Sequence, residues 1–277
     1  MRSVALGLVA MVVTACGGGL AELDPAAPAD PAAPGVGVVA APAGITAVHP
    51  GEKMQFEVRL AGVLGGEATF VTGAFSQRDG RPVVVLSSSI HSAGALALVK
   101  DIRDEATTVL DLDALEPLST SSVVRANPRD YTAETRFADQ RAAIDFRPAQ
   151  GDPIRLIYDF GDQIAHDAHS AMAQMRIWEA PAGATRTMWV LGGRRIWKVD
   201  LTMGPGEVIG TYGGNQATVR IDGVAYRAYA NLRVDDRRPP RTFSVWMSDD
   251  ADRVPFRVVA GTELGAVTIE LVDYQRP

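Results

Sequence analysis

The chain has 277 residues, of which 47% are hydrophobic and 22% are charged, and it contains a single cysteine. Its formal net charge of −6 at pH 7 is opposite to the basic balance that proteins use against phosphate, so we expect no nucleic-acid partner. The hydrophobic fraction can bury a sizeable core, and one cysteine means that this core forms without internal disulfides.

Residues 1–15 have the pattern of a secretory signal peptide. Arg2 supplies a positive charge, and the apolar run from 4 to 13 is too short for a stable membrane span. The sequence Val13-Thr14-Ala15-Cys16 resembles the bacterial lipobox, in which small residues precede a cysteine that is acylated and becomes the new N-terminus. We therefore interpret Cys16 as a lipidation site for acyl chains such as palmitate; the alternative is an ordinary signal with an incidental thiol.

Acyl chains on Cys16 would hold the protein at a membrane without spanning it. Gly17 stands where lipoproteins retained in the inner membrane usually have Asp, which favours the outer membrane, and we expect the protein at its periplasmic face. Residues 16–46 are rich in Gly, Ala and Pro and have almost no hydrophobic periodicity. This composition predicts a disordered tether, with a Pro-rich ligand for a partner protein as the alternative.

Residues 47–277 are expected to form a single all-β domain, a large twisted antiparallel sheet or partly open β-barrel of hairpins. The alternation of Met54, Phe56 and Val58 with polar residues begins a long series of short strands separated by Gly-rich turns. Hairpin turns are predicted at Gly192-Gly193, Gly204-Pro205-Gly206, Gly213-Gly214 and, most strongly, Asp222-Gly223.

The C-terminal residues 241–274 predict three strands in a meander. The turn between the first two contains Asp249 and Asp250, which favour a turn by accepting backbone hydrogen bonds and which can pair with Arg253. Paired carboxylates also serve as general acids and bases, but acids packed in a turn beside an arginine favour a structural role.

One segment, residues 167–178, breaks the strand pattern and predicts a central helix. Asp167 can cap its first turn. Its apolar residues follow the i, i+3, i+4 spacing of one buried helical face, at positions 168, 171, 172, 175 and 178. A lone helix in a β protein usually fills a barrel end or packs on the concave side of a curved sheet.

Several of these pieces resemble, in order and spacing, a bacterial envelope family catalogued as domain of unknown function 3108. They are the opening Pro50-Gly51-Glu52-Lys53 with Phe56-Glu57-Val58, the helix at Asp167-Ala168-His169-Ser170-Ala171-Met172, and Trp246-Met247-Ser248-Asp249-Asp250 followed by Arg253-Val254-Pro255 and Leu264-Gly265. The resemblance implies export and an all-β fold, without a known reaction. In architecture alone the pattern is similar to the Lol lipoprotein carriers, in which a helix plugs an unclosed barrel that holds acyl chains.

Candidate metal ligands are His166 and His169, whose spacing directs both imidazoles to one side of a helix start. No third or fourth ligand is evident, so the alternative is a polar helix cap with a solvent-facing histidine, and we expect no cofactor. The serines of Ser87-Ser88-Ser89 have no nucleophile-elbow pattern and are interpreted as strand residues that face solvent.

Six aromatic residues are candidates for a ligand-facing concave surface. They are Trp178, Trp189, Trp197, Tyr226, Tyr229 and Trp246. On the inside of a curved sheet they could cradle an apolar ligand, or the helix could fill the same space.

The sequence thus predicts a lipid-anchored, non-enzymatic protein whose β domain binds an envelope component such as a lipid, a lipidated chain or a glycan. The alternative is an assembly factor that docks a protein partner by a sheet edge. A metal-dependent hydrolase that uses His166 and His169 is the third hypothesis.

The lipidation hypothesis predicts that Cys16→Ala abolishes metabolic labelling of the protein with fatty acid, because no other cysteine can accept the acyl chains. Gel fluorography after feeding a radiolabelled fatty acid measures this. Labelling that persists in the variant would refute the assignment.

Overall fold

The computed structural model describes residues 48–98, 100–126, 130–262 and 265–276. The predicted signal peptide 1–15, Cys16 and the predicted tether 16–46 lie outside the described residues.

Eight strands precede the long helix, with one short helix among them. They are β1 (Lys53–Leu60), β2 (Val63–Arg78), β3 (Arg81–Ser92), α2 (Gly94–Ala97), β4 (Arg103–Asp111), β5 (Glu116–Arg125), β6 (Tyr131–Ala138), β7 (Arg141–Pro148) and β8 (Ile154–Asp159). The remaining elements are β9 (Ala165–His166), α3 (Ala168–Arg176), β10 (Thr185–Gly192), β11 (Arg195–Thr211), β12 (Gly214–Ala228), β13 (Arg241–Ser248), β14 (Pro255–Thr262) and β15 (Gly265–Gln275).

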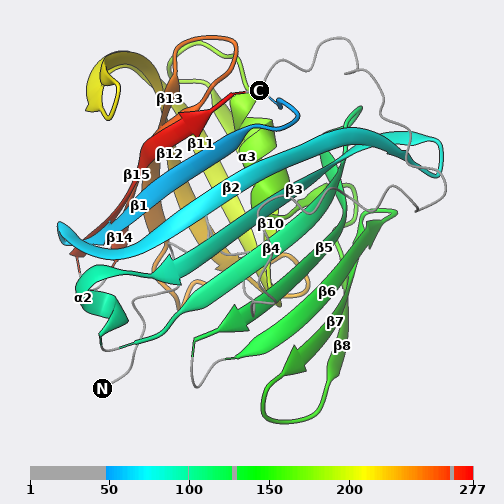
Figure 1. The fold of residues 1–277 in the computed structure, drawn as a ribbon. Helices are drawn as coiled ribbons and strands as arrows, with labels where there is room; N and C mark the ends of the chain where they lie inside the picture. The colour runs from blue at the N-terminus through cyan, green and yellow to red at the C-terminus, as the bar shows by residue number, and fades with distance from the viewer. Residues whose placement is uncertain (1–47, 99, 127–129, 263–264, 277) are drawn as a thin grey trace.

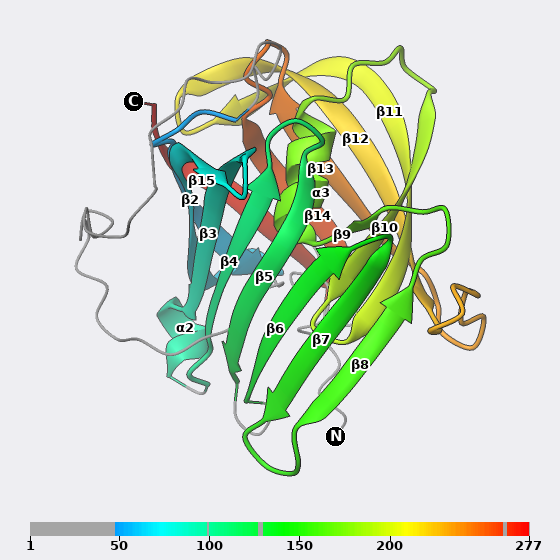
Figure 2. The same cartoon turned by 90° about the vertical axis from the view of Figure 1, so that its right-hand side faces the viewer.

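All fifteen strands belong to one sheet, in the order β8-β7-β6-β5-β4-β3-β2-β1-β15-β14-β13-β12-β11-β10-β9. Every neighbouring pair is antiparallel except β9 and β10. The sheet curves around α3, which both views place inside the curve, but it does not close into a barrel (Figures 1 and 2). The predicted fold class, an all-β partly open barrel with one central helix, is confirmed.

The C-terminal meander shows how side-chain alternation builds the wall. Val245 on β13 lies opposite Val258 on β14, which lies opposite Ile269 on β15, and all three are buried in the main hydrophobic core. The intervening residues face outward, as the period of two requires. The three strands predicted for this region are therefore confirmed.

Two predicted hairpin turns are wrong. Asp222-Gly223 lies inside β12, where Gly223 pairs with Phe243 on one side. A Cβ on Gly223 would lie 2.2 Å from Cζ of Phe243, so glycine is needed for the ring to cross the strand rather than for a turn. Gly204-Pro205-Gly206 lies inside β11, where the register with β12 shifts between Met203 and Gly206, and it forms a bulge.

The predicted helix is confirmed as α3, which ends at Arg176, two residues before the predicted end. Asp167 is its N-cap: the carboxylate accepts from the Ser170 N–H, and the Ser170 hydroxyl accepts from the Asp167 N–H, which is a reciprocal capping box. Among the described residues, no helix has the length and apolar character needed to cross a bilayer.

A buried ion pair fixes the C-terminal end of α3. The guanidinium of Arg176 donates to both carboxylate oxygens of Glu52 at 2.7 and 2.8 Å, and the exposed fractions of the two side chains are 3% and 0%. Arg176 also donates to the Asp252 carbonyl, and the Tyr274 hydroxyl donates to Glu52. Burial and the adjacent Glu52 carboxylate raise the pKa of Tyr274.

Arg176→Met should lower the free energy of unfolding by roughly 3–5 kcal/mol, because it leaves the Glu52 carboxylate buried without its charge partner. The double variant Glu52→Leu, Arg176→Met should recover at least ~2 kcal/mol of that loss, since no unpaired charge remains. Urea unfolding followed by circular dichroism measures both.

The matched control is Arg155→Met, whose 3.8 Å pairing with Asp145 is long and exposed on both sides and should contribute about 0–1 kcal/mol. Equal losses in the Arg176 single and double variants would contradict the assignment of the cost to an uncompensated charge.

Candidate ligand-binding cavity

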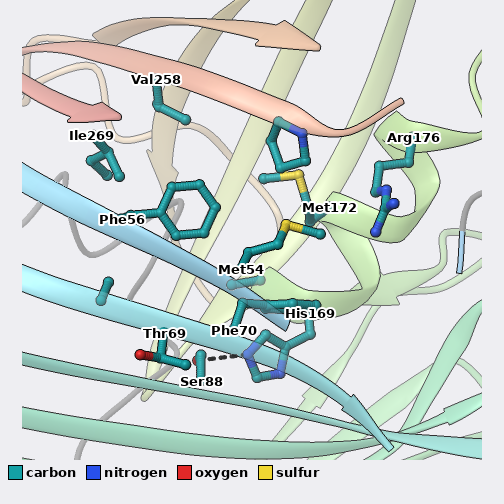
Figure 3. Close-up of a pocket in the computed structure, with 13 residues that line it drawn as sticks. Met54, Phe56, Thr69, Phe70, Ser88, His169, Met172, Arg176, Val258 and Ile269 are labelled. Carbon is teal, nitrogen blue, oxygen red and sulfur yellow. Dashed lines mark hydrogen bonds between the residues drawn. The ribbon is translucent and has the colours of Figure 1, made fainter. Parts of the chain in front are cut away.

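A cavity of about 60 Å³ lies between α3 and the wall formed by β3, β2, β1, β15 and β14. Its lining comes from the helix face that looks at this wall and from the inward residues of the five strands: Met54, Phe56, Ala68, Thr69, Phe70, Ser88, Ala168, His169, Met172, Arg176, Pro255, Val258 and Ile269. Figure 3 shows Met172 directed from α3 toward the strands, with Phe56, Val258 and Ile269 beyond it.

Most of this lining is apolar. Met54 from β1 and Met172 from α3 contribute unbranched thioether side chains, which adapt their shape to irregular contents more readily than branched residues do. Phe70 packs edge-on against the His169 imidazole, with ring centroids 5.5 Å apart. The walls therefore favour an apolar occupant.

One end of the cavity is polar. Ser88 Oγ lies 2.7 Å from His169 Nε2, and His169 Nδ1 lies 2.8 Å from Thr108 Oγ1 (Figure 3 draws the first contact). Thr108 donates to the Asp167 carboxylate, as does Thr120 at 2.8 Å. The N-terminal turn of α3 is thus hydrogen-bonded to β3, β4 and β5. Burial lowers the pKa of His169, partly opposed by the charge of Asp167, which favours the neutral imidazole.

The protein-family model for DUF3108, a family of unknown function, matches residues 55–272. The chain belongs to this family. The resemblance seen in the sequence is thereby confirmed, and the match includes every residue that lines the cavity except Met54. No curated protein matches the chain.

Three solved structures match the chain, and the first of them, with a TM-score above 0.5, has a similar fold. A β-barrel-like protein of domain of unknown function DUF1849 from Brucella abortus is 9% identical with a TM-score of 0.53, over 82% of this chain and 98% of that one. A protein provisionally described as exported, with a YmcC-like fold, from Bacteroides fragilis is 10% identical with a TM-score of 0.37, over 83% and 98%. A provisionally assigned lipoprotein from Parabacteroides distasonis is 6% identical with a TM-score of 0.35, over 83% and 98%.

Both candidate metal ligands are buried, so the expectation of a solvent-facing histidine is wrong. His169 bonds to hydroxyl groups, and His166 lies 3.3 Å from the Ser170 hydroxyl. Burial lowers the pKa of His166 to about 4, opposed by the Asp167 charge. Within the described ranges, no group of three or more His, Cys, Asp or Glu side chains could hold a metal ion.

The six predicted ligand-facing aromatic residues do not line the cavity. Trp189 and Trp197 are buried in separate core clusters. Trp178 packs against the cluster that contains Trp197. Trp246, Tyr226 and Tyr229 are half-buried: Trp246 donates to Glu207, and the two tyrosine rings lie beside Lys198 and Arg237 respectively. Aromatic content alone did not indicate which sheet face each ring would take.

The site residues that sequence reasoning missed are Ser88, Thr108 and Thr120. Ser88 was expected to face solvent, but it lies on the inner side of β3 and bonds to His169. A signal was present in the period of two, because Leu86 and Ile90 are buried on the same side of the strand as Ser88.

Asp249 and Asp250, in the turn between β13 and β14, have different contacts. Asp250 Oδ1 accepts from the Asp252 and Arg253 N–H groups at 3.0 and 3.2 Å and from the Ser248 hydroxyl at 2.6 Å. The Asp249 carboxylate, by contrast, lies 3.7 Å from the Arg253 guanidinium, which is a long contact. The turn lies outside the residues that line the cavity.

Asp250→Ala should lower the free energy of unfolding by about 1–2 kcal/mol through the loss of three hydrogen bonds, and Asp250→Asn should lower it less because an oxygen remains. Asp249→Ala, the neighbouring control, should change it by about 0–0.5 kcal/mol. Thermal melts of the three variants measure this. A larger loss of stability for Asp249→Ala than for Asp250→Ala would contradict the assignment of the structural role to Asp250.

Proposed function

We propose that this protein is a lipoprotein, anchored through Cys16 at the periplasmic face of the outer membrane, that binds an apolar chain of an envelope lipid or lipidated molecule between α3 and the sheet. The observation that supports it is the apolar cavity enclosed by Met54, Phe56, Met172 and Ile269. The lipobox pattern at Cys16 supports the anchor.

The size and lining of the cavity favour a single hydrocarbon chain over a glycan. A cavity of about 60 Å³ is far smaller than the roughly 300–1,000 Å³ of sites for drug-sized ligands. A sugar ring would also require several convergent polar groups. The walls supply thioether, aromatic and aliphatic surface instead.

The proposal assigns binding without catalysis, although Ser88 and His169 have the spacing of a nucleophile and its base. Acyl transfer also needs hydrogen-bond donors aimed at the developing oxyanion. In α3, the Ser170 N–H is bound by Asp167 and the Arg176 guanidinium is bound by Glu52, so neither serves that purpose.

A second candidate function is the docking of an extended peptide at β8. This strand ends the sheet order, and its Ile157 side chain is 63% exposed. An edge strand offers unpaired backbone groups to an incoming strand.

Filling the cavity should prevent binding of the chain. Ala68→Leu places additional volume in the cavity from β2, and it should weaken binding of cis-parinaric acid, a fluorophore that is a single unbranched chain, by at least about tenfold, since overpacking must displace α3 or the ligand. Fluorescence titration measures this in the full chain carrying Cys16→Ala, so that the protein's own acyl chains cannot compete.

Ala74→Leu is the matched control, because Ala74 lies on the same strand, is exposed and does not line the cavity. It should bind the fluorophore as the parent does. Equal affinity in both variants would overturn the proposal, as would the absence of binding by the parent chain, provided that circular dichroism shows both variants folded.

A further inference from the structure

The backbone of β8 is hydrogen-bonded to β7 through alternate residues. The Phe160 N–H donates to the Gln140 carbonyl at 2.9 Å, one position beyond the last pair of the β7–β8 register. In an antiparallel ladder, bonded and non-bonded pairs alternate, so the even-numbered residues of β8 bond to β7. The N–H and C=O groups of Arg155, Ile157 and Asp159 therefore point to the open edge. Figure 2 shows β8 as the last strand of its row, as the sheet order requires.

The same three residues carry exposed side chains on the outer face of β8. Ile157, which is 63% exposed, lies between the cation of Arg155 and the anion of Asp159. On the inner face, Leu156 and Tyr158 pack against a core cluster. The inner side chains thus hold β8 in place as a strand, while no other strand of the described residues pairs with its outer edge.

This pattern is complementary to a second copy of itself. When two β8 strands pair antiparallel about a two-fold axis at Ile157, Ile157 lies opposite its own copy. Arg155 of each chain then lies opposite Asp159 of the other, and paired residues point to the same face of the sheet. Every one of these pairs joins residues whose backbone groups point to the edge, so each pair exchanges both N–H···O=C bonds.

Other registers satisfy fewer of these groups. A shift of one residue places Arg155 opposite a residue whose N–H and C=O groups are already bonded to β7, so the ladder cannot form. A shift of two residues keeps the backbone bonds but places Ile157 opposite Arg155 or Asp159, which leaves the charges without opposite partners. Backbone direction and charge therefore select the same register.

Charges on β7 extend the pattern across both copies. Within one chain, Asp145 lies 3.8 Å from Arg155, and Arg141 lies 3.1 Å from Asp159. In the joined sheet, a row of outer side chains reads Asp145 and Arg155, then Asp159 and Arg141 of the second copy, so that the sign alternates at every step. None of these residues lines the cavity, so this contact is independent of the ligand.

We infer that β8 is a homodimer interface, at which two copies of this chain join their sheets edge to edge in the register centred on Ile157. The inference goes beyond the proposed ligand binding, and it assigns the open edge of β8 to a second copy instead of an extended peptide. One short strand buries less surface than a permanent dimer requires, so the association is weak in solution. Anchoring both copies in one membrane raises their effective concentration.

A disulfide tests the register. The full chain carrying Cys16→Ala has no thiol, and Ile157→Cys then adds one at the two-fold axis. Opposite Cα atoms of a bonded pair lie about 5.5 Å apart, within the range of a disulfide. Oxidation should give a covalent dimer on a non-reducing gel.

The matched control is Ala143→Cys, because Ala143 lies opposite Ile157 on β7. Its two copies would be three strand spacings apart, about 14 Å, which a disulfide cannot bridge. Ile157→Cys should therefore form at least about tenfold more covalent dimer than the control.

Charge variants test the partner without a covalent bond. Arg155→Asp and Asp159→Arg should each weaken self-association by at least about tenfold, because each places like charges opposite one another at both ends of the interface. A mixture of the two variants should associate again, since one chain then presents only anions and the other only cations. Sedimentation velocity at low salt measures this, and added salt should weaken the parent dimer.

The inference is overturned if the parent stays monomeric up to about 200 μM, well above the range expected for a weak specific dimer. It is also overturned if Ile157→Cys and Ala143→Cys crosslink alike, or if the mixed charge variants associate no better than either variant alone. A monomeric parent that captures an extended peptide at β8 would support the second candidate function instead. Circular dichroism establishes that each variant is folded. Failure of ligand binding in the cavity leaves all these outcomes unchanged.

Discussion

The Asp167 carboxylate holds a helix end and a sheet wall at the same time. It caps α3 through the Ser170 N–H and accepts from Thr108 and Thr120 on β4 and β5. A buried charge costs several kcal/mol unless it is hydrogen-bonded, and the positive end of a helix favours a negative one. These demands are met together only when α3 lies against these strands, so the cavity is the space left between the helix and the opposite part of the sheet.

Asp104 also has a buried carboxyl group, but it lacks hydrogen-bond partners of the kind that Asp167 has. Its exposed fraction is 6%, and its Oδ1 has no hydrogen-bond partner among the described residues. Burial raises its pKa to about 7, partly opposed by Lys100. Because the folded state binds a proton that the unfolded state has released, this group's contribution to stability falls as pH rises from its ordinary pKa of 3.8 toward 7. The inner surface of β4 thus contacts one satisfied acid, Asp167 of the α3 cap, and carries one unsatisfied acid, Asp104.

The sequence predicted the strands and the helix because both depend on local period. Alternation of apolar and polar residues predicted the strands that contain Val245 and Ile269, and the apolar spacing after Asp167 predicted α3. The errors came from non-local causes. Gly223 resembled a turn residue because its contact, the Phe243 ring, is supplied by another strand.

The functional residues were harder to predict for the same reason. In Ser87-Ser88-Ser89 three identical side chains give no contrast among themselves, so the inner face is indicated only by Leu86 and Ile90 on either side. Ser88 acquires its partner from a helix 81 residues later. Glu52 and Arg176 are 124 residues apart, so neither position indicates that it belongs to a buried pair. The alternation of apolar and polar residues shows which side chains of a strand face inward. The partner of a buried polar side chain depends on which strands and helices the assembled sheet brings together.

The sheet order also constrains how the chain can assemble. From β1 to β8 and from β10 to β15 every strand pairs with its neighbours in sequence, and the single antiparallel pairing between distant strands joins β1 to β15. Two meanders can therefore form with short loop closures, and one closure across the whole domain brings them together. Since Lys53 lies opposite Gln275, a permuted chain that links these ends and opens between β8 and β9 would turn that distant closure into a hairpin. The natural and the permuted chain would then have the same contacts in the folded sheet. They would differ in the entropy lost on closing the loop that joins β1 to β15.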